Sequence, residues 1–229
     1  MKLSILVPVY DEVATVSQAL KRVLDVDFPC EVELVVVDDG SRDGTSDLLD
    51  QIDDPRVLVH RHATNRGKGA AIRTAAQCAT GDYMTIFDAD LEYDPADIPT
   101  LLAPVIAQEA EVVYGIRTFS SHTSYSFWFV IGNRVVTTFA NVLFNCYIRD
   151  LETCCKLLPL PLYRELDVRA NGFGLEAEVT GKLLRRGHRP YELPVSYRAR
   201  GRAEGKKLTW RDGIEALWIL LRTRLSRPV

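Results

Sequence analysis

Apolar runs and helical repeats alternate through the first half of the chain. Short runs rich in β-branched residues predict strands over 3–9, 31–37, 57–60, 83–87 and 111–115. Apolar residues recur at helical spacing between them and predict helices over about 15–24, 43–51, 70–79 and 98–108. Strict alternation of strand and helix is typical of a parallel sheet covered on both faces. We therefore expect an α/β fold.

The second half of the chain has a different pattern. Residues 127–144 predict one or two amphipathic helices, because Asn133, Arg134 and Asn141 interrupt bulky apolar residues. We expect five segments to follow: a short apolar segment over 151–158, a helix over 175–186, a strand over 191–197, a basic loop over 198–207 and a terminal helix over 210–225. Because we find no repeat or low-complexity linker, we expect a single domain over 1–229.

Composition narrows the functional classes. The 229 residues are 47% hydrophobic and 26% charged, and a net charge of −3 argues against general nucleic-acid binding. No run reaches about 18 uninterrupted apolar residues, so we expect no membrane-spanning helix, and the first apolar run is too short for a signal peptide. The five cysteines form no C-x-x-C pair, which favours free thiols in the cytosol. We expect Cys154 and Cys155 to be small packed residues rather than a redox pair.

Three acidic residues, Asp88, Asp90 and Glu92, follow the strand over 83–87 at alternate positions. In an extended segment they would share one face, where they would repel each other without a cation among them. Carboxylate oxygens suit Mg²⁺ or Mn²⁺, and Mg²⁺ is typically held by one or two carboxylates plus substrate phosphates. The motif predicts a divalent ion that carries a nucleoside diphosphate; the alternative is an acidic strand end beside solvent.

Further polar motifs end the first two strands. Residues 8–12, Pro-Val-Tyr-Asp-Glu, follow the first strand, and Asp38 and Asp39 follow the second. Each motif alone could be a turn or a helix cap. Ligands of open α/β sheets bind at the carboxyl ends of the strands, so we expect these motifs to meet in one crevice.

Taken in order, these motifs resemble family 2 glycosyltransferases with the GT-A fold, and most nearly the polyprenyl (dolichyl) phosphate mannose synthases. The resemblance covers 8–12, 38–45, 65–70, 88–92, 115–117, 133–134, 150–156, 172–178 and 191–218. It implies a GT-A nucleotide-diphospho-sugar transferase fold, with a mostly parallel Rossmann-like sheet and a C-terminal acceptor-side extension. Residues 1–118 would be the nucleotide-sugar-binding half, and 119–229 the acceptor- and membrane-facing half.

The resemblance implies a role for each matching position. The nucleoside would be bound by Pro8, Tyr10, Glu12, Val37 through its backbone, and Asp39. The ribose and diphosphate would meet Asp88, Ala89 and Asp90, and the metal would be held by Asp88, Asp90 and Glu92. Phosphate would be contacted by Arg117, Arg134, Arg200 and Lys206, with Arg198 and Arg202 as alternatives to Arg200. Asp90, Arg117 and Lys206 would be the catalytic residues.

Other positions are given secondary roles. We interpret the Asn65–Gly69 loop as one that allows a helix to pack closely on the sheet. We expect Lys68 to support the residues that contact the ligand rather than to contact the ligand itself. Lys156 stands where relatives often carry Arg, so it keeps the charge but loses the bidentate fork. Glu176 and Glu178 could be structural or could line the acceptor site.

The implied reaction is inverting, metal-dependent transfer of a hexosyl unit from a nucleotide-diphosphate sugar, with GDP-mannose favoured, to polyprenyl monophosphate. An ionised phosphate needs no strong general base, so we expect none of the four histidines to be essential. A lipid acceptor implies peripheral contact with the cytoplasmic face of a membrane, through 125–129 or the terminal helix. The alternatives are a UDP-glucose or UDP-N-acetylhexosamine donor, a different acceptor, or a nucleotide-binding regulatory subunit.

Overall fold

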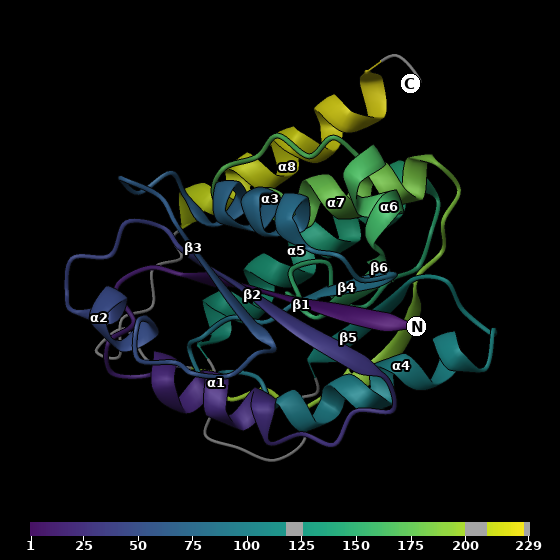
Figure 1. Ribbon diagram of the computed structural model, residues 1–229. Coiled ribbons are helices and arrows are strands. Elements are labelled where there is room, and N and C mark those ends of the chain that lie inside the picture. The colour runs from purple at the N-terminus through teal and green to yellow at the C-terminus, as the bar shows by residue number, and fades with distance from the viewer. Residues whose placement is uncertain (118–125, 200–209, 227–229) are drawn as a thin grey trace.

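A computed structural model of the protein describes residues 1–117, 126–199 and 210–226 (Figure 1). Within these ranges, seven strands form one sheet in the order β3-β2-β1-β4-β6-β5-β7. They are β1 (Lys2–Val9), β2 (Glu31–Asp38), β3 (Val57–Arg61), β4 (Tyr83–Ile86), β5 (Val113–Arg117), β6 (Lys156–Pro159) and β7 (Tyr191–Val195). All neighbours pair in parallel except β6, which is antiparallel to both β4 and β5. The predicted mostly parallel α/β sheet is confirmed.

Helices cover both faces of the sheet. They are α1 (Val16–Leu24), α2 (Thr45–Leu49), α3 (Lys68–Cys78), the 3-10 turn η1 (Pro95–Asp97), α4 (Ile98–Ile106), α5 (Phe127–Phe144), α6 (Leu160–Glu165), α7 (Leu175–Arg185) and α8 (Trp210–Leu225). Figure 1 shows α1 and α4 below the sheet, with α3, α6 and α7 above it. The sequence analysis did not predict α6, although proline in the first turn of a helix is a common start signal.

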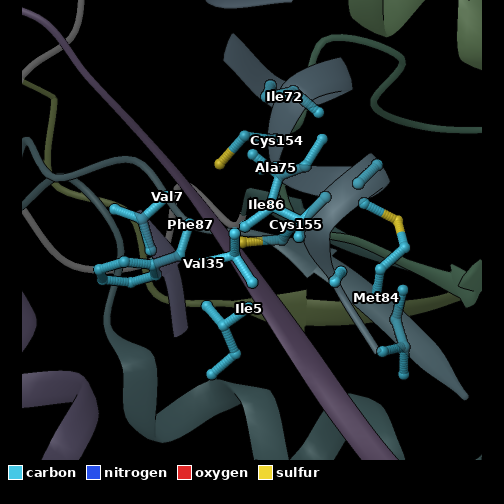
Figure 2. Packing of buried hydrophobic residues seen from close by; sticks show 14 of the residues in the cluster. Ile5, Val7, Val35, Ile72, Ala75, Met84, Ile86, Phe87, Cys154 and Cys155 are labelled. Atoms are coloured by element: carbon cyan, nitrogen blue, oxygen red, sulfur yellow. The ribbon is translucent and has the colours of Figure 1, made fainter. Parts of the chain in front are cut away.

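The main core lies between the sheet and these helices. Strands β1 and β2 are buried along almost their whole length, which is why their sequences read as continuous apolar runs. Cys154 and Cys155 are 3% and 6% exposed and pack among Ile86 and Ala75 (Figure 2). All five cysteines are free thiols, so the prediction of small packed residues is confirmed.

A second apolar cluster joins α5, α7 and α8. Its buried residues include Val136 and Ala140 of α5, Leu184 of α7 and Leu220 of α8. Helix α5 is one continuous helix of 18 residues with a mean hydropathy of 1.3, long and apolar enough to cross a membrane by length and composition only. Asn133 and Arg134 interrupt its apolar residues, as the sequence analysis noted, so the expectation of no membrane-spanning helix stays a prediction.

The acidic stretch after β4 is a turn. Strand β4 ends at Ile86, and Leu91 adopts a left-handed φ of 62°. The prediction that Asp88, Asp90 and Glu92 lie on one face of an extended segment is therefore wrong. A non-glycine residue in this conformation is uncommon and reverses the chain direction locally.

Candidate active site at the carboxyl ends of the strands

A cavity of about 380 Å³ lies where several parallel strands end. Such a volume is within the range of small-molecule sites. Nine residues with predicted binding roles line it: Pro8, Tyr10, Glu12, Asp39, Asp88, Ala89, Asp90, Glu92 and Arg117. These residues come from four strand ends and the turns that follow them, so the topology brings together motifs that are far apart in the sequence.

The other predicted residues do not line the cavity or lie outside the description. Val37 is fully buried inside β2, and Arg134 is exposed on α5. Arg200, Arg202 and Lys206 lie outside the described residues.

The lining is strongly acidic. Seven carboxylates face two cations among the described lining residues; the acids are Glu12, Asp39, Asp88, Asp90, Glu92, Glu152 and Glu176, and the cations are Lys68 and Arg117. A diphosphate brought into such a lining would be repelled unless additional cations came with it or closed over it. The chemistry of the lining therefore fits a ligand that arrives with a divalent ion.

Lys68 is more directly involved than the sequence analysis predicted. Its ammonium group lies 2.8 Å from Asp88 and 2.9 Å from Glu176, and it lines the cavity. Burial alone would lower the pKa of Lys68, but these two carboxylates raise it well above the ordinary value. The glycine loop that carries it also contacts a neighbouring loop, because the Gly69 N–H donates to the Asn171 carbonyl at 2.7 Å. The helix that the loop opens packs against the sheet, with Ala71 and Ile72 fully buried in the main core.

Asp39 organises the glycine loop. Its carboxylate accepts hydrogen bonds from the backbone N–H groups of Arg66 and Gly67, and Nδ1 of His62 lies 2.6 Å from its Oδ1. The sequence analysis missed this role of His62. The neighbouring Asp38 is 1% exposed and binds the Ser41 N–H, so its capping alternative describes the observed contact.

Arg117 at the end of β5 is clamped by Asp150. Its Nε and Nη2 each donate to this carboxylate at 2.7 Å, and Asn133 donates to the same group at 3.1 Å. Burial would raise the pKa of Asp150, but the adjacent guanidinium lowers it below the ordinary value. The fork of Arg117 is thus oriented by a buried carboxylate while the residue lines the cavity.

Two carboxylates that line the cavity each have one buried oxygen atom without a hydrogen-bond partner in the described part of the chain. These are Oε1 of Glu152 and Oε2 of Glu176. Burial, followed by the nearby Glu176 charge, raises the pKa of Glu152 to about 7. Buried acceptors of this kind are costly unless a ligand, water or proton satisfies them. Glu178 is structural instead, since it caps the Arg169 and Ala170 N–H groups.

Lys156 does not face the cavity. Its ammonium group donates to the carbonyl groups of Leu151 and Thr153 and lies 4.8 Å from the Tyr114 ring centroid. Burial lowers its pKa from the ordinary value. The charge thus stabilises the segment before β6 through two backbone carbonyl groups rather than through a carboxylate.

The predicted metal ligands form no cluster of three in the described structure. No group of three or more His, Cys, Asp or Glu side chains in the ranges that the structure covers is arranged to hold a metal ion. Asp88 and Asp90 both line the cavity, and two carboxylates suffice for an ion whose remaining ligands come from phosphate and water. Glu92 lines the same cavity, and its Oε2 accepts a 2.6 Å hydrogen bond from the Tyr197 hydroxyl.

The sequence analysis also missed Tyr197, Glu152 and Asp150. Tyr197 follows β7, which is parallel to β5, so the strand-end rule that located Asp39 and Asp88 could have found it. Glu152 and Asp150 precede a strand whose antiparallel pairing the sequence pattern does not indicate.

Undecaprenyl-phosphate 4-deoxy-4-formamido-L-arabinose transferase of Proteus mirabilis is 35% identical over 54% of this chain, and the chain spans 39% of that protein. Undecaprenyl-phosphate mannosyltransferase of Micrococcus luteus is 26% identical over 99% of this chain and 100% of its own length.

Solved structures share the fold. Glucosyl-3-phosphoglycerate synthase from Mycobacterium tuberculosis, in complex with Mn²⁺, UDP and phosphoglyceric acid, has a TM-score of 0.72 at 16% identity, covering 99% of this chain and 80% of that one. Residues 1–349 of S. aureus TarS, in complex with UDP-GlcNAc, have a TM-score of 0.65 at 18% identity, covering 97% of this chain and 66% of that one. The predicted GT-A fold is confirmed.

The sequence model described as "Glycosyl transferase family 2" matches residues 4–166, which are more than half of the chain. The match includes most of β1, strands β2 to β6 and the acidic turn that lines the cavity. The chain therefore belongs to glycosyltransferase family 2 and is a glycosyltransferase.

Proposed function

We propose that the protein transfers a hexosyl unit from a nucleoside-diphosphate sugar to a polyprenyl monophosphate with inversion at the anomeric carbon, and that GDP-mannose is the favoured donor. The observation that carries the proposal is the acidic cavity at the strand ends, where the predicted nucleoside and diphosphate residues meet. The Micrococcus luteus relative, named a mannosyltransferase acting on undecaprenyl phosphate, supports the acceptor and the sugar.

A divalent ion fits the donor side of the cavity. Asp88 and Asp90 would hold Mg²⁺ or Mn²⁺ together with the donor phosphates. The bound ion supplies charge neutralisation of the departing diphosphate. Arg117, oriented by Asp150, would contribute a second positive charge beside it, and Lys206 and Arg200 are proposed to close over the same group.

The unsatisfied carboxylate oxygens suit the transferred sugar. Glu152 and Glu176 line the same cavity as the diphosphate residues and lack partners for one oxygen each in the described structure. A carboxylate oxygen accepts hydrogen bonds, and a hexose offers several hydroxyl donors. We assign these two groups to hydroxyls of the hexosyl unit, which would remove the cost of burying them unpaired.

The reaction requires positioning more than proton transfer. A phosphate oxygen of the acceptor attacks the anomeric carbon, the bond from that carbon to the donor diphosphate breaks, and the electron pair leaves with the nucleoside diphosphate. Because the attacking phosphate is already ionised, no proton must be removed from it. This agrees with the cavity lining, in which the described residues include no histidine. Catalysis would rest on orientation and electrostatic stabilisation.

A lipid acceptor lies in a membrane, so the protein needs a surface that binds the membrane. Helices α5 and α8 offer such a surface. Trp128 is 78% exposed and Trp218 is 63% exposed, and these helices also carry exposed Arg222 and Arg224. Phe129 lines the cavity directly beside Trp128, so the first turn of α5 connects the apolar surface to the site. Aromatic and basic residues on paired helices are typical of peripheral attachment to an anionic leaflet. On this ground we propose that the protein attaches peripherally to the cytoplasmic face of a membrane.

The test is a transfer assay. Radiolabelled GDP- and UDP-sugars are incubated with polyprenyl phosphate in vesicles, with Mg²⁺ or Mn²⁺ and with a chelator. Metal-dependent labelling of the lipid from GDP-mannose is the expected result, and Asp90→Asn should abolish it. Labelling from UDP-glucose or UDP-N-acetylhexosamine instead would correct the donor. Donor binding without lipid labelling would overturn the proposed acceptor and favour another acceptor or a regulatory nucleotide-binding role.

A further inference from the structure

Tyr197 contacts two residues with opposite charges and opposite proposed roles. Its hydroxyl donates to Oε2 of Glu92 at 2.6 Å, and the face of its ring lies 5.1 Å from the guanidinium carbon of Arg117. The ring also packs against Tyr93 at a centroid distance of 5.0 Å. All four residues line the cavity.

The backbone around Tyr197 is fixed to the acidic turn. Tyr93 and Tyr197 form an antiparallel bridge, and the Arg198 N–H donates to the Glu92 carbonyl at 2.7 Å. The Ser196 N–H donates to the Asp97 carboxylate at 2.6 Å. These bonds leave the Tyr197 side chain little freedom to leave the cavity wall.

Arg117 and Glu92 carry opposite charges and both contact Tyr197, so an ion pair between them is the alternative arrangement. That pair would remove a cation from the diphosphate and a carboxylate from the divalent ion. The contacts with Tyr197 oppose this ion pair, because the Tyr197 hydroxyl donates a hydrogen bond to Glu92 while the Tyr197 ring and Asp150 hold Arg117. Each half of the tyrosine side chain thus supports a different residue.

We propose that Tyr197 is a positioning residue of the donor site: its hydroxyl orients Glu92 toward the divalent ion, and its ring holds Arg117 for the diphosphate. The inference rests on the proposed function. Outer hydrogen-bond partners of a metal-binding carboxylate commonly change metal affinity by about 10- to 100-fold when removed. A cation over a ring face depends on the ring and not on the hydroxyl.

Two substitutions separate these halves. Tyr197→Phe removes the hydroxyl and keeps the ring, whereas Tyr197→Leu removes both. Calorimetry measures the binding of Mn²⁺ alone, and then of GDP and of UDP at saturating Mn²⁺. We expect Tyr197→Phe to weaken Mn²⁺ binding about tenfold while the affinity for the nucleotide changes less than about twofold. We expect Tyr197→Leu to weaken both by about tenfold or more.

Tyr114→Phe is the matched control. Tyr114 also donates or accepts a hydroxyl hydrogen bond, with Thr180 at 3.0 Å, and also has a cation, Lys156, over its ring. It lies outside the cavity lining, so this variant should bind Mn²⁺ and nucleotide as the wild type does. Glu92→Gln alone should weaken Mn²⁺ binding at least as much as Tyr197→Phe, because it removes the carboxylate ligand itself. Adding Tyr197→Phe to Glu92→Gln should then cause little further loss of Mn²⁺ affinity, because the hydroxyl has no carboxylate left to orient.

Several results would overturn the inference. Unchanged Mn²⁺ binding by Tyr197→Phe would exclude the hydroxyl's role, and equal nucleotide affinity of the Phe and Leu variants would exclude the ring's role. Wild-type protein that binds Mn²⁺ but neither nucleotide would instead overturn the proposed function, while the Mn²⁺ comparison would still decide the role of the hydroxyl. Wild-type protein that binds no Mn²⁺ would overturn both.

Discussion

The ammonium group of Lys68 lies 2.8 Å from the carboxylate of Asp88, the residue proposed to bind the divalent ion. Lys68 also pairs with Glu176, and it holds these two acids together across the cavity. Replacing Lys68 with Met would leave both charges uncompensated in a largely buried site. We expect a loss of about 3 kcal/mol in the free energy of unfolding, measured by urea denaturation without metal.

Lys21→Met is the control for this prediction. Lys21 forms an exposed ion pair with Asp25, so its removal should cost less than about 0.5 kcal/mol. Adding Mn²⁺ should stabilise Lys68→Met more than the wild type, because the ion can replace the missing positive charge. Equal losses for the two lysine variants would contradict the assigned role of Lys68.

Asp39 and Asp38 are neighbours, but replacing each carboxylate with an amide should change the stability of the protein by different amounts. Both oxygens of Asp39 accept from backbone N–H groups, so Asp39→Asn would turn one acceptor into a donor that faces another donor. We expect about 2 kcal/mol of destabilisation and weaker nucleotide binding, measured by urea denaturation and calorimetry.

Asp38→Asn provides the matched comparison. One Asp38 oxygen accepts from a backbone N–H and the other from the Ser46 hydroxyl, which can itself accept a hydrogen bond from the new amide. This variant should lose less than half as much stability as Asp39→Asn. The reverse order would show that the glycine loop does not depend on Asp39.

The sequence pattern was sufficient for the order of strands and helices in the first half, because buried parallel strands show their apolar runs locally. It could not indicate β6, since antiparallel insertion between β4 and β5 depends on distant pairing. The acidic motif was located correctly, but its geometry was wrong because the left-handed residue Leu91 turns the chain. The contact of Asp150 with Arg117 likewise depends on tertiary packing and cannot be read from the sequence.

The pKa of Glu152, raised to about 7 by burial and then by Glu176, predicts a pH-dependent stability. Between the ordinary pKa of 4.5 and about 7, the folded protein keeps a proton that the unfolded chain releases. The contribution of this group to stability therefore falls as pH rises through that window, by about 3 kcal/mol as an upper bound.

Glu152→Gln removes the titration. We expect a flatter stability profile from pH 5 to pH 8 than in the wild type, and greater stability at pH 8, measured by urea denaturation at both values. Glu109→Gln changes an exposed acid and should keep the wild-type slope. A wild-type slope in Glu152→Gln would show that another group titrates in this range.

Trp128 is the most direct test of the proposed membrane surface. It is 78% exposed, stacks edge-on against Phe127 at 5.3 Å and precedes Phe129 in the cavity wall. An acidic side chain at this position loses apolar contact with the lipid and is repelled by anionic head groups. Trp128→Glu should therefore weaken co-sedimentation with anionic vesicles by about tenfold and leave nucleotide affinity nearly unchanged.

Leu58→Glu is the control. It places the same charge at an exposed position of β3, where the leucine side chain is 42% exposed, and this variant should bind vesicles as the wild type does. Equal vesicle binding by Trp128→Glu and the wild type would remove α5 from the membrane surface, whereas a matching loss in Leu58→Glu would reduce the effect to net charge.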